Sequence, residues 1–288
     1  MTDATADLST VTWGDPDAEN TALLVHGLTG RADAFRPLAE ELQSEGLMGW
    51  RFLAVDLRGR GETGPVNGTA GISAHGADIL ALMDRERLDN VAYVGHSLGA
   101  MIGVYLAANH PERVSKLVLV DGGADVTEEI DALLIPVHER LKRTYPSREA
   151  YVEFVRNLPV FEDRWDENLE RYFSGDVRPD GGEWRHRADL ETVGDDREKM
   201  RGFPLSELWR RIECPTLVLL STVGLAGPDE GFILPPQEAR RMQEAIPDCE
   251  LVEVEDTNTT ISSTPPRRPR LSRSGICSPV PDLHYRMG

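Results

Sequence analysis

Short apolar runs alternate with amphipathic stretches along the first 120 residues of the chain. The apolar runs, which predict buried strands, are Thr21–Val25, Arg51–Leu57, Val91–Val94 and Val114–Val120. The stretches with helical spacing are Asp33–Glu45, Ile72–Leu88 with a predicted Ser73 cap, and a third that begins at Leu98 and ends near Asn109. Strands that alternate with helices at this spacing predict an α/β protein with a mostly parallel sheet and helices on both faces.

This alternation stops between Ala124 and about Leu208, where the sequence is polar, charged and helix-like without a strand run. We expect a helical cap inserted over one end of the sheet. The parallel pattern then resumes with a strand at Cys214–Leu220, a helix at Pro236–Ala245 and a last strand at Glu250–Val254. The predicted organisation is therefore a core of residues 1–123 and 209–256, a cap of residues 124–208 and an irregular tail of residues 257–288.

Charge and composition narrow the possible partners. The 288 residues carry a formal net charge of −18, which argues against nucleic-acid binding. No apolar stretch approaches the roughly 18–20 residues that span a bilayer, and the first residues lack the basic and apolar regions of a signal peptide. We expect a cytoplasmic protein that acts on a small molecule. The sequence does not indicate an oligomeric state.

The basic residues are mainly arginine, with only three lysines, Lys116, Lys142 and Lys199. Many acids with few lysines are typical of proteins adapted to concentrated salt, which screens the repulsion within such a surface. A GC-rich genome would also favour arginine. The three cysteines lie far apart and show no metal-ligand spacing.

The strongest motif is Gly95-His96-Ser97-Leu98-Gly99, which directly follows the apolar run at Val91–Val94. The pattern G-x-S-x-G between a strand and a helix is typical of a nucleophile elbow, a sharp turn that lifts the serine hydroxyl off the strand end. The N-terminus of the following helix directs its N–H groups at the same place. Ser97 is therefore the candidate nucleophile.

Two further motifs extend the pattern: His26-Gly27 after the first buried strand, and Asp56-Leu57-Arg58-Gly59-Arg60-Gly61 after the second. With the elbow, they resemble the α/β-hydrolase superfamily over about residues 10–258, and in particular its capped, serine-dependent esterase and haloperoxidase-like branch. The resemblance implies that Ser97 attacks a carbonyl carbon and that backbone N–H groups of Leu28 and Leu98 hold the oxyanion. It also implies structural roles for His26 and His96, and no metal or organic cofactor.

The acid of the expected triad has two candidates. Asp229, in the turn Gly227-Pro228-Asp229 after the strand at Cys214–Leu220, occupies the position that the resemblance favours. Asp121, at the end of the preceding strand, is the alternative, since some relatives carry their acid there. Either aspartate also fits a loop role in which its carboxylate accepts local N–H groups.

The catalytic histidine that the resemblance implies, just after Asn258, is missing. The chain reads Asp256-Thr257-Asn258-Thr259-Thr260, where relatives read Asp-x-Asn-His. Composition changes at the same point: 26 basic and 48 acidic residues precede Thr257, whereas five arginines and one acid follow. One extra C after the Asn258 codon would turn a threonine codon into CAC, histidine. We therefore predict a frameshifted tail from about Thr259, with a native disordered basic tail as the competing hypothesis.

The other histidines offer no clear replacement. His284 lies in the tail, and His138 and His186 lie in the predicted cap, where a histidine is more often a surface or packing residue. We expect a serine hydrolase of an ester or related acyl compound, impaired by the missing base. The alternatives are C–C bond hydrolysis or cofactor-free perhydrolysis at the same site, a non-catalytic ligand-binding homologue, and a gene product that folds poorly.

One further motif is set aside. Gly59–Gly64 matches G-x-G-x-x-G, but Pro65 follows and no helix begins there, so a dinucleotide site is not expected.

Overall fold

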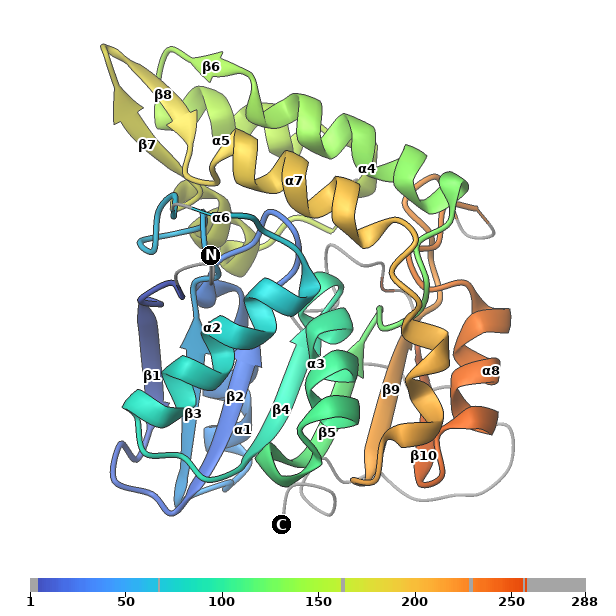
Figure 1. Ribbon diagram of the computed structural model, residues 1–288. Helices are drawn as coiled ribbons and strands as arrows, with labels where there is room; N and C mark the ends of the chain where they lie inside the picture. Colours follow the sequence, from blue (N-terminus) through green and yellow to red (C-terminus); the bar gives the residue numbers. More distant parts are fainter. Residues whose placement is uncertain (1–4, 67, 162–163, 228–229, 256, 258–288) are drawn as a thin grey trace.

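A seven-stranded sheet with helices on both faces forms the centre of the molecule (Figure 1). The computed structural model describes residues 5–66, 68–161, 164–227, 230–255 and 257. The strand order is β1-β3-β2-β4-β5-β9-β10, and all neighbours are parallel except the edge pair β1 and β3. The predicted α/β class, with its mostly parallel sheet, is thus confirmed.

The strands of this sheet are β1 (Thr10–Gly14), β2 (Asn20–Val25), β3 (Trp50–Val55), β4 (Val91–His96), β5 (Val114–Val120), β9 (Thr216–Ser221) and β10 (Cys249–Val254). The helices around it are α1 (Arg36–Ser44), α2 (Ile72–Arg85), α3 (Leu98–Asn109) and α8 (Pro236–Ala245). Short 3₁₀ helices are η1 (Ala32–Phe35), η2 (Pro111–Arg113), η4 (Leu205–Glu207) and η5 (Trp209–Arg211). Among the described residues, no helix is long and apolar enough to cross a bilayer.

The core has two halves, one on each face of the sheet. In β2, Leu23 and Val25 face the cluster that contains residues of α2, α3 and α8, whereas Ala22 and Leu24 face the cluster that contains residues of α1. Successive side chains of a strand point to opposite faces, so a strand buried on both sides is apolar throughout. This explains why the central strands are continuous hydrophobic runs in the sequence.

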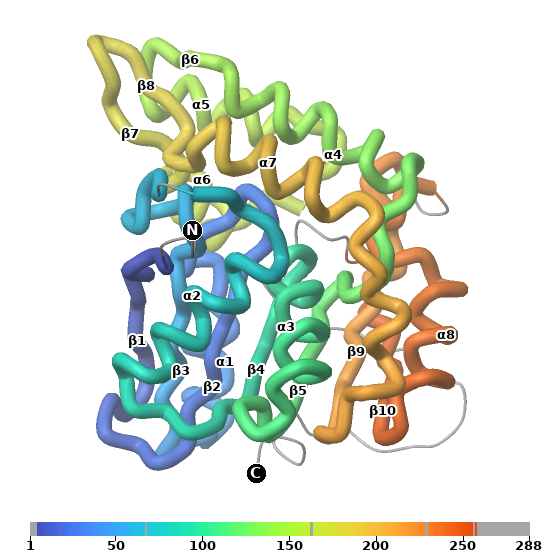
Figure 2. Tube along the Cα trace, viewed as in Figure 1, coloured from blue at the N-terminus to red at the C-terminus, as the bar shows by residue number. Residues whose placement is uncertain are grey.

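The segment between β5 and β9 lies over the upper edge of the sheet and contains both helices and strands (Figures 1 and 2). We call residues 124–208 the inserted segment. Its elements are α4 (Glu128–Leu141), β6 (Thr144–Tyr145), α5 (Arg148–Arg156), η3 (Pro159–Phe161), α6 (Glu167–Ser174), β7 (Val177–Asp180), β8 (Glu183–His186) and α7 (Leu190–Met200), followed by η4. An isolated parallel bridge joins Val126 to Arg201, so the two ends of these elements meet.

The expectation of a purely helical insertion was wrong. A small antiparallel sheet, β6-β8-β7, lies at its outer end. The turn between β7 and β8 is Gly181-Gly182, and both residues have positive φ, at 60° and 93°. Two glycines in this conformation are a strong hairpin signal, which the high polarity of the flanking strands obscured. The division into core and cap, with the boundaries given above, stays a prediction.

Three local predictions also need correction. Ser73 lies inside α2 and does not cap it; the N-cap is Gly71, with no side-chain hydrogen bond. The first helix is preceded by η1, so α1 begins at Arg36 rather than Asp33. The edge strand β1 was missed, although Thr10-Val11-Thr12-Trp13 is rich in β-branched and aromatic residues.

A buried ionic cluster connects the inserted segment to the sheet layer. Asp196 of α7 accepts hydrogen bonds from Gly71 N at 2.6 Å and His75 Nε2 at 2.9 Å, and it pairs with Arg60 Nη2 at 2.5 Å. Arg60, His75 and Asp196 are all fully buried. Burial acts to raise the pKa of Asp196, but Arg60 and His75 outweigh it and hold the pKa well below its usual value. The charged carboxylate is therefore a fixed part of this junction.

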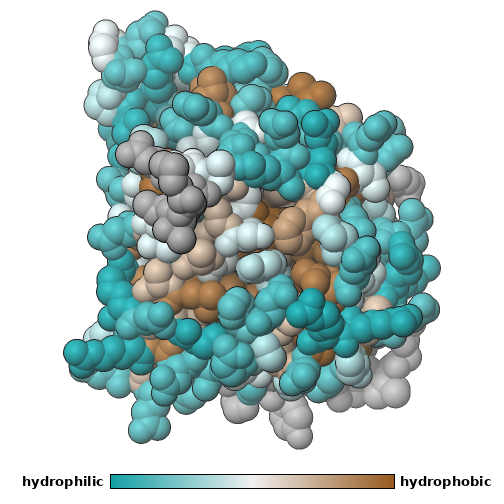
Figure 3. Space-filling model, in the orientation of Figure 1, coloured by the Kyte–Doolittle hydropathy of each residue, from teal (hydrophilic) through white to brown (hydrophobic). Residues whose placement is uncertain are grey.

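The outer surface is mainly hydrophilic, in keeping with the acidic composition. Figure 3 shows hydrophilic side chains around most of one face, with apolar side chains visible in its middle. Among the described residues, the exposed large apolar ones are Met48, Ile135 and Leu190.

Candidate active site

Ser97 stands at the junction of β4 and α3 in a strained conformation. Its φ is 51° and its ψ −113°, a region that residues other than glycine rarely adopt, at a cost of about 1–3 kcal/mol. Its N–H donates to Val120 O at 2.9 Å, and its carbonyl accepts from Met101 N at 3.1 Å. The backbone on both sides thus fixes the turn, which leaves the side chain partly exposed.

Close backbone contacts explain the glycines around Ser97. A Cβ at Gly99 would lie 2.0 Å from Val25 O, and one at Gly95 would lie 2.3 Å from Gly99 O. On the next strand, a Cβ at Gly122 would lie 2.7 Å from Ser97 O. The elbow can therefore form only where these three positions have no side chain.

The two candidate oxyanion donors lie next to Ser97. Leu98 is the first residue of α3, so its N–H is among those with no acceptor within the helix. On the other side, Leu28 follows Gly27, where a Cβ would be 3.2 Å from Ser97 Cβ. Arg60 Nε donates to Leu28 O at 2.9 Å, which fixes the orientation of that peptide.

His26 holds the loop that carries Leu28 through hydrogen bonds at both of its ring nitrogens. Leu57 N donates to its Nε2 at 3.1 Å, so the ring proton lies on Nδ1, which donates to Gly27 O at 2.8 Å. Burial lowers the pKa of His26 to about 3, and Arg60 adds to this. A neutral imidazole with both nitrogens engaged has a structural role.

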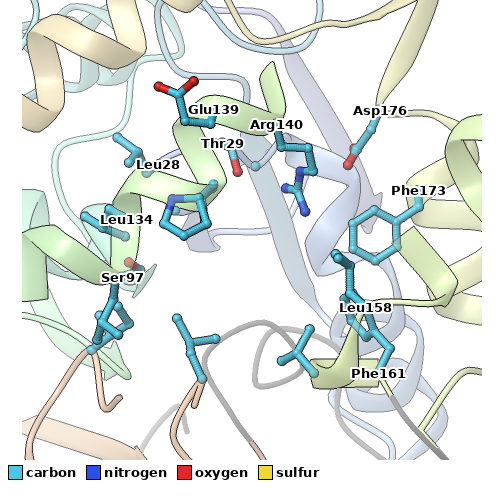
Figure 4. Close-up of a pocket in the computed structure, with 18 of the residues that line it drawn as sticks. Leu28, Thr29, Ser97, Leu134, Glu139, Arg140, Leu158, Phe161, Phe173 and Asp176 are labelled. Atoms are coloured by element: carbon cyan, nitrogen blue, oxygen red, sulfur yellow. The ribbon is translucent and has the colours of Figure 1, made fainter. Parts of the chain in front are cut away.

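A cavity of about 650 Å³ opens above Ser97, between the sheet edge and the inserted segment (Figure 4). Its walls are largely apolar and come from the loop after β2 (residues 27–30), the elbow, α4, α5 and the segment around η3 and α6. The main apolar contributors are Leu28, Leu133, Leu134, Phe154, Leu158, Phe161, Phe173 and Ile233. The polar groups among the lining residues include Thr29, Glu139, Arg140 and Asp176. The cavity has the size and character of a small-molecule site.

Of the two candidate acids of the expected triad, the structure describes Asp121. Asp121 follows β5 and is buried, with a positive φ of 47°. Its N–H donates to Leu219 O at 2.9 Å, and its Oδ1 accepts from Ser221 N at 3.4 Å. The carboxylate thus lies at the same edge of the sheet as Ser97. Asp229, the other candidate, lies outside the described residues.

Among the described histidines, none donates to or accepts from Ser97 Oγ. His75 is bonded to Asp196, and His138 Nε2 lies 3.4 Å from Leu190 O, between α4 and α7. His186 is buried in β8, and its Nδ1 accepts from Ala188 N at 3.0 Å. His96 lines the cavity from within the elbow. The position after Asn258 and His284 both lie outside the described residues.

One polar residue of the cavity escaped the sequence analysis. Arg140, near the end of α4, belongs to no motif, and on an amphipathic helix it resembles any surface arginine. Only the fold reveals that it faces the cavity (Figure 4). Within the described ranges, no group of three or more His, Cys, Asp or Glu side chains is arranged to hold a metal ion.

Comparison with known proteins identifies the family of this chain. The sequence profile described as "alpha/beta hydrolase fold" matches residues 21–259. The chain belongs to the α/β-hydrolase fold family. It is 29% identical over 239 residues to a Rhizobium rhizogenes protein named "Putative carbamate hydrolase RutD", covering 82% of this chain and 84% of the relative.

A second relative and two solved structures extend the comparison. A Bacillus subtilis protein named "Putative 2-succinyl-6-hydroxy-2,4-cyclohexadiene-1-carboxylate synthase" is 26% identical over 265 residues, 88% of each chain. The structure of E-2-(acetamidomethylene)succinate hydrolase superposes with a TM-score of 0.74 at 20% identity, covering 89% of this chain and 90% of the other. The structure of a Rickettsia typhi protein named "Putative Hydrolase" gives a TM-score of 0.72 at 22% identity, covering 88% of this chain and 86% of the other. At these identities, the structures show the shared fold alone.

Proposed function

We propose that the chain is a serine hydrolase that cleaves an ester or related acyl compound through an acyl-serine intermediate. The observation that carries this proposal is the strained Ser97 turn beneath an apolar cavity of about 650 Å³. A hydroxyl held at the end of a strand, beside two candidate N–H donors, is suited to attack a bound carbonyl carbon. The R. rhizogenes relative, named for carbamate hydrolysis, supports an acyl substrate in the wider sense.

The proposed reaction has two steps. Ser97 Oγ forms a bond to the carbonyl carbon, and its proton passes to a base while the carbonyl oxygen becomes an oxyanion. The N–H groups of Leu28 and Leu98 stabilise that charge, an effect worth about 10²–10³ in rate for each donor. The leaving group takes the proton and departs, and water then cleaves the acyl-serine with the same base. Asp229, or alternatively Asp121, orients the base.

The base is the missing part, and we propose that this chain is impaired for that reason. Loss of the histidine from a serine triad costs on the order of 10⁶ in turnover. The sequence around Asn258 supports a frameshift as the origin of the loss. If instead the chain binds ligand without turnover, it is a binding protein on a hydrolase fold, and the apolar cavity is the observation that favours this second candidate. C–C bond hydrolysis and perhydrolysis stay open as other reactions of the same site.

The test compares hydrolysis of p-nitrophenyl esters in molar KCl by two chains. One is the chain as it stands, and the other carries a histidine after Asn258 and a restored terminal helix. We expect turnover only in the restored chain, and its loss in a restored Ser97→Ala variant. Ser73→Ala, on the exposed side of α2, is the matched control.

Each other outcome is informative. Equal activity in both chains would refute the impairment and require another base. If neither chain acts although both fold, and a fluorophosphonate, which forms an O–P bond to an activated serine with loss of fluoride, fails to label Ser97 of the restored chain by mass spectrometry, the hydrolase proposal is wrong. Saturable ligand binding would then favour the binding protein.

A further inference from the structure

Arg140 is a cation in a largely apolar cavity, and its Nε finds no hydrogen-bond acceptor in the described part of the chain. It lines the cavity together with Leu158, Phe161 and Phe173, and its side chain points into the cavity from α4 (Figure 4). Its Nε is shielded from solvent and has no hydrogen-bond partner among the described residues. A buried donor without an acceptor carries a free-energy cost, which is larger when the group is charged. A bound ligand would remove this cost.

Asp176, a carboxylate that lines the same cavity, is already engaged by other groups. Arg31 Nε donates to Asp176 Oδ1 at 3.1 Å, and Tyr151 Oη donates to Oδ2 at 3.3 Å. His186 Nε2 lies 3.7 Å from Oδ2. Burial acts to raise the pKa of Asp176, but His186, Arg31 and Arg140 outweigh it and keep the pKa below its usual value. Arg140 thus acts on Asp176 through its charge, whereas the direct contacts of this carboxylate are those with Arg31, Tyr151 and His186.

Two other charged residues, Glu139 and Arg143, belong to this region. Glu139 also lines the cavity, but its Oε1 accepts from Lys142 Nζ at 2.5 Å on the exposed side of α4. Arg143 stacks on Phe154, with its Cζ 4.9 Å from the ring centroid, and is exposed. Arg140 and Arg143 both line the cavity, but only Arg140 combines a shielded Nε that lacks a hydrogen-bond acceptor among the described residues with a place beside the apolar wall.

We propose that Arg140 binds a carboxylate of the substrate, and that the substrate is an acyl compound with a carboxylate at the end remote from the reacting carbonyl. The guanidinium is planar and forms two parallel hydrogen bonds with a carboxylate. Ser97 and Arg140 lie on different sides of the cavity, with apolar side chains between them (Figure 4). A ligand that spans them has a carbonyl at one end, an apolar body and an anion at the other end. This inference rests on the proposed function for the reacting end only.

The experiment measures binding rather than turnover, so the missing base does not affect it. The chain as it stands is titrated with monomethyl esters of the linear dicarboxylic acids from succinate to suberate. Each is compared with the methyl ester of the monocarboxylic acid of equal carbon number. At the chain length that spans the cavity, we expect the carboxylate to lower Kd by about 10- to 100-fold, the range for a charge-assisted hydrogen bond. No preference at any length would overturn the proposal.

Variants assign the preference to Arg140. Arg140→Gln is expected to abolish it while the neutral esters bind as before, and Arg140→Lys to keep part of it. The control is Arg148→Gln, since Arg148 is an exposed cation of α5 that lies over Trp184, outside the cavity. A preference that survives in Arg140→Gln would place the carboxylate elsewhere and refute the assignment. Ser97→Ala separates the two proposals, because it abolishes acylation and leaves the carboxylate preference unchanged.

Discussion

Replacing Asp196 with asparagine tests the buried ionic cluster that joins α7 to the sheet layer. The side chain is fully buried and contacts three groups, Gly71 N, His75 Nε2 and Arg60 Nη2, all within 3 Å. Asparagine keeps the shape and loses the charge, so Arg60 becomes a buried cation without a counter-ion. Breaking one side of a buried pair costs about 3–5 kcal/mol, and we expect the free energy of unfolding to fall by that amount.

The effect should also reach the active site. Arg60 Nε holds Leu28 O at 2.9 Å, so an Arg60 that moves in search of a partner disturbs the oxyanion loop. We therefore expect Asp196→Asn to weaken binding of neutral methyl esters as well as stability. Stability is measured by urea denaturation at 25 °C. If m, the slope of the free energy of unfolding against urea concentration, is unchanged, the shift in midpoint reports the loss of stability directly.

The neighbouring residue is a matched control. Asp195 accepts from Ala70 N at 2.6 Å and Lys199 Nζ at 2.9 Å, but its side chain is 33% exposed. Water can replace these partners, so Asp195→Asn is expected to cost about 1 kcal/mol or less. If Asp196→Asn costs no more than Asp195→Asn, the reasoning about buried charge at this junction is refuted. A double replacement of Arg60 and Asp196 by apolar residues should recover much of the loss.

Three other changes follow from the structure. The pKa of His26 falls to about 3 on folding. Between about pH 6.5 and pH 3, the unfolded chain therefore binds a proton at His26 that the folded chain does not. The free energy of unfolding should fall by about 1.4 kcal/mol for each pH unit as the pH drops through this window. Urea titrations of His26→Gln should lack this component, and parallel pH curves for the two chains would contradict it. Gly99→Ala places a methyl 2.0 Å from Val25 O, so we expect loss of at least 1–3 kcal/mol in thermal or urea unfolding and loss of ester binding; a variant as stable as the parent would show that the elbow can relax. The net charge of −18 predicts an unfolding midpoint that rises between 0.1 and 2 M KCl, and a flat or falling midpoint would count against adaptation to salt.

The sheet was predictable from sequence because its signals are local. The strand at Val114–Val120 and the helix at Pro236–Ala245 have the predicted bounds, since a continuous apolar run and an amphipathic period each reflect burial directly. The hairpin at Gly181-Gly182 was missed because its strands are short, polar and mostly exposed, so they carry no apolar signal. Ser73 was misplaced as a cap because the N-cap lies two residues earlier, at Gly71, whose N–H donates to Asp196 across 125 residues.

The sequence predicted the motif residues of the candidate site but not the residues that line the cavity above it. Ser97 follows from the G-x-S-x-G pattern, whereas Leu28 and Leu98 came from the resemblance to the α/β-hydrolase superfamily; Leu98 directly follows Ser97 and Leu28 lines the same cavity, while their roles stay predictions. Arg140 had no such pattern, because its position over the cavity depends on how α4 packs against the rest of the inserted segment. Residues that a tight turn requires can be recognised from a short sequence motif. A residue such as Arg140, which faces the cavity from another segment, can be recognised only once the fold is known.

The bridge between Val126 and Arg201 has a consequence for how such a protein diversifies. The two ends of the intervening residues meet beside β5 and β9, which are adjacent strands. Domain insertions are tolerated where the ends lie close together, because the host needs no change of its own geometry. Recombination could thus exchange residues 127–200 as a single cassette and bring in a new ligand preference while the elbow stays untouched. A chimera that joins Val126 to Arg201 through a short turn should retain the seven-stranded sheet, provided that the charge left on Arg60 is removed with its partner.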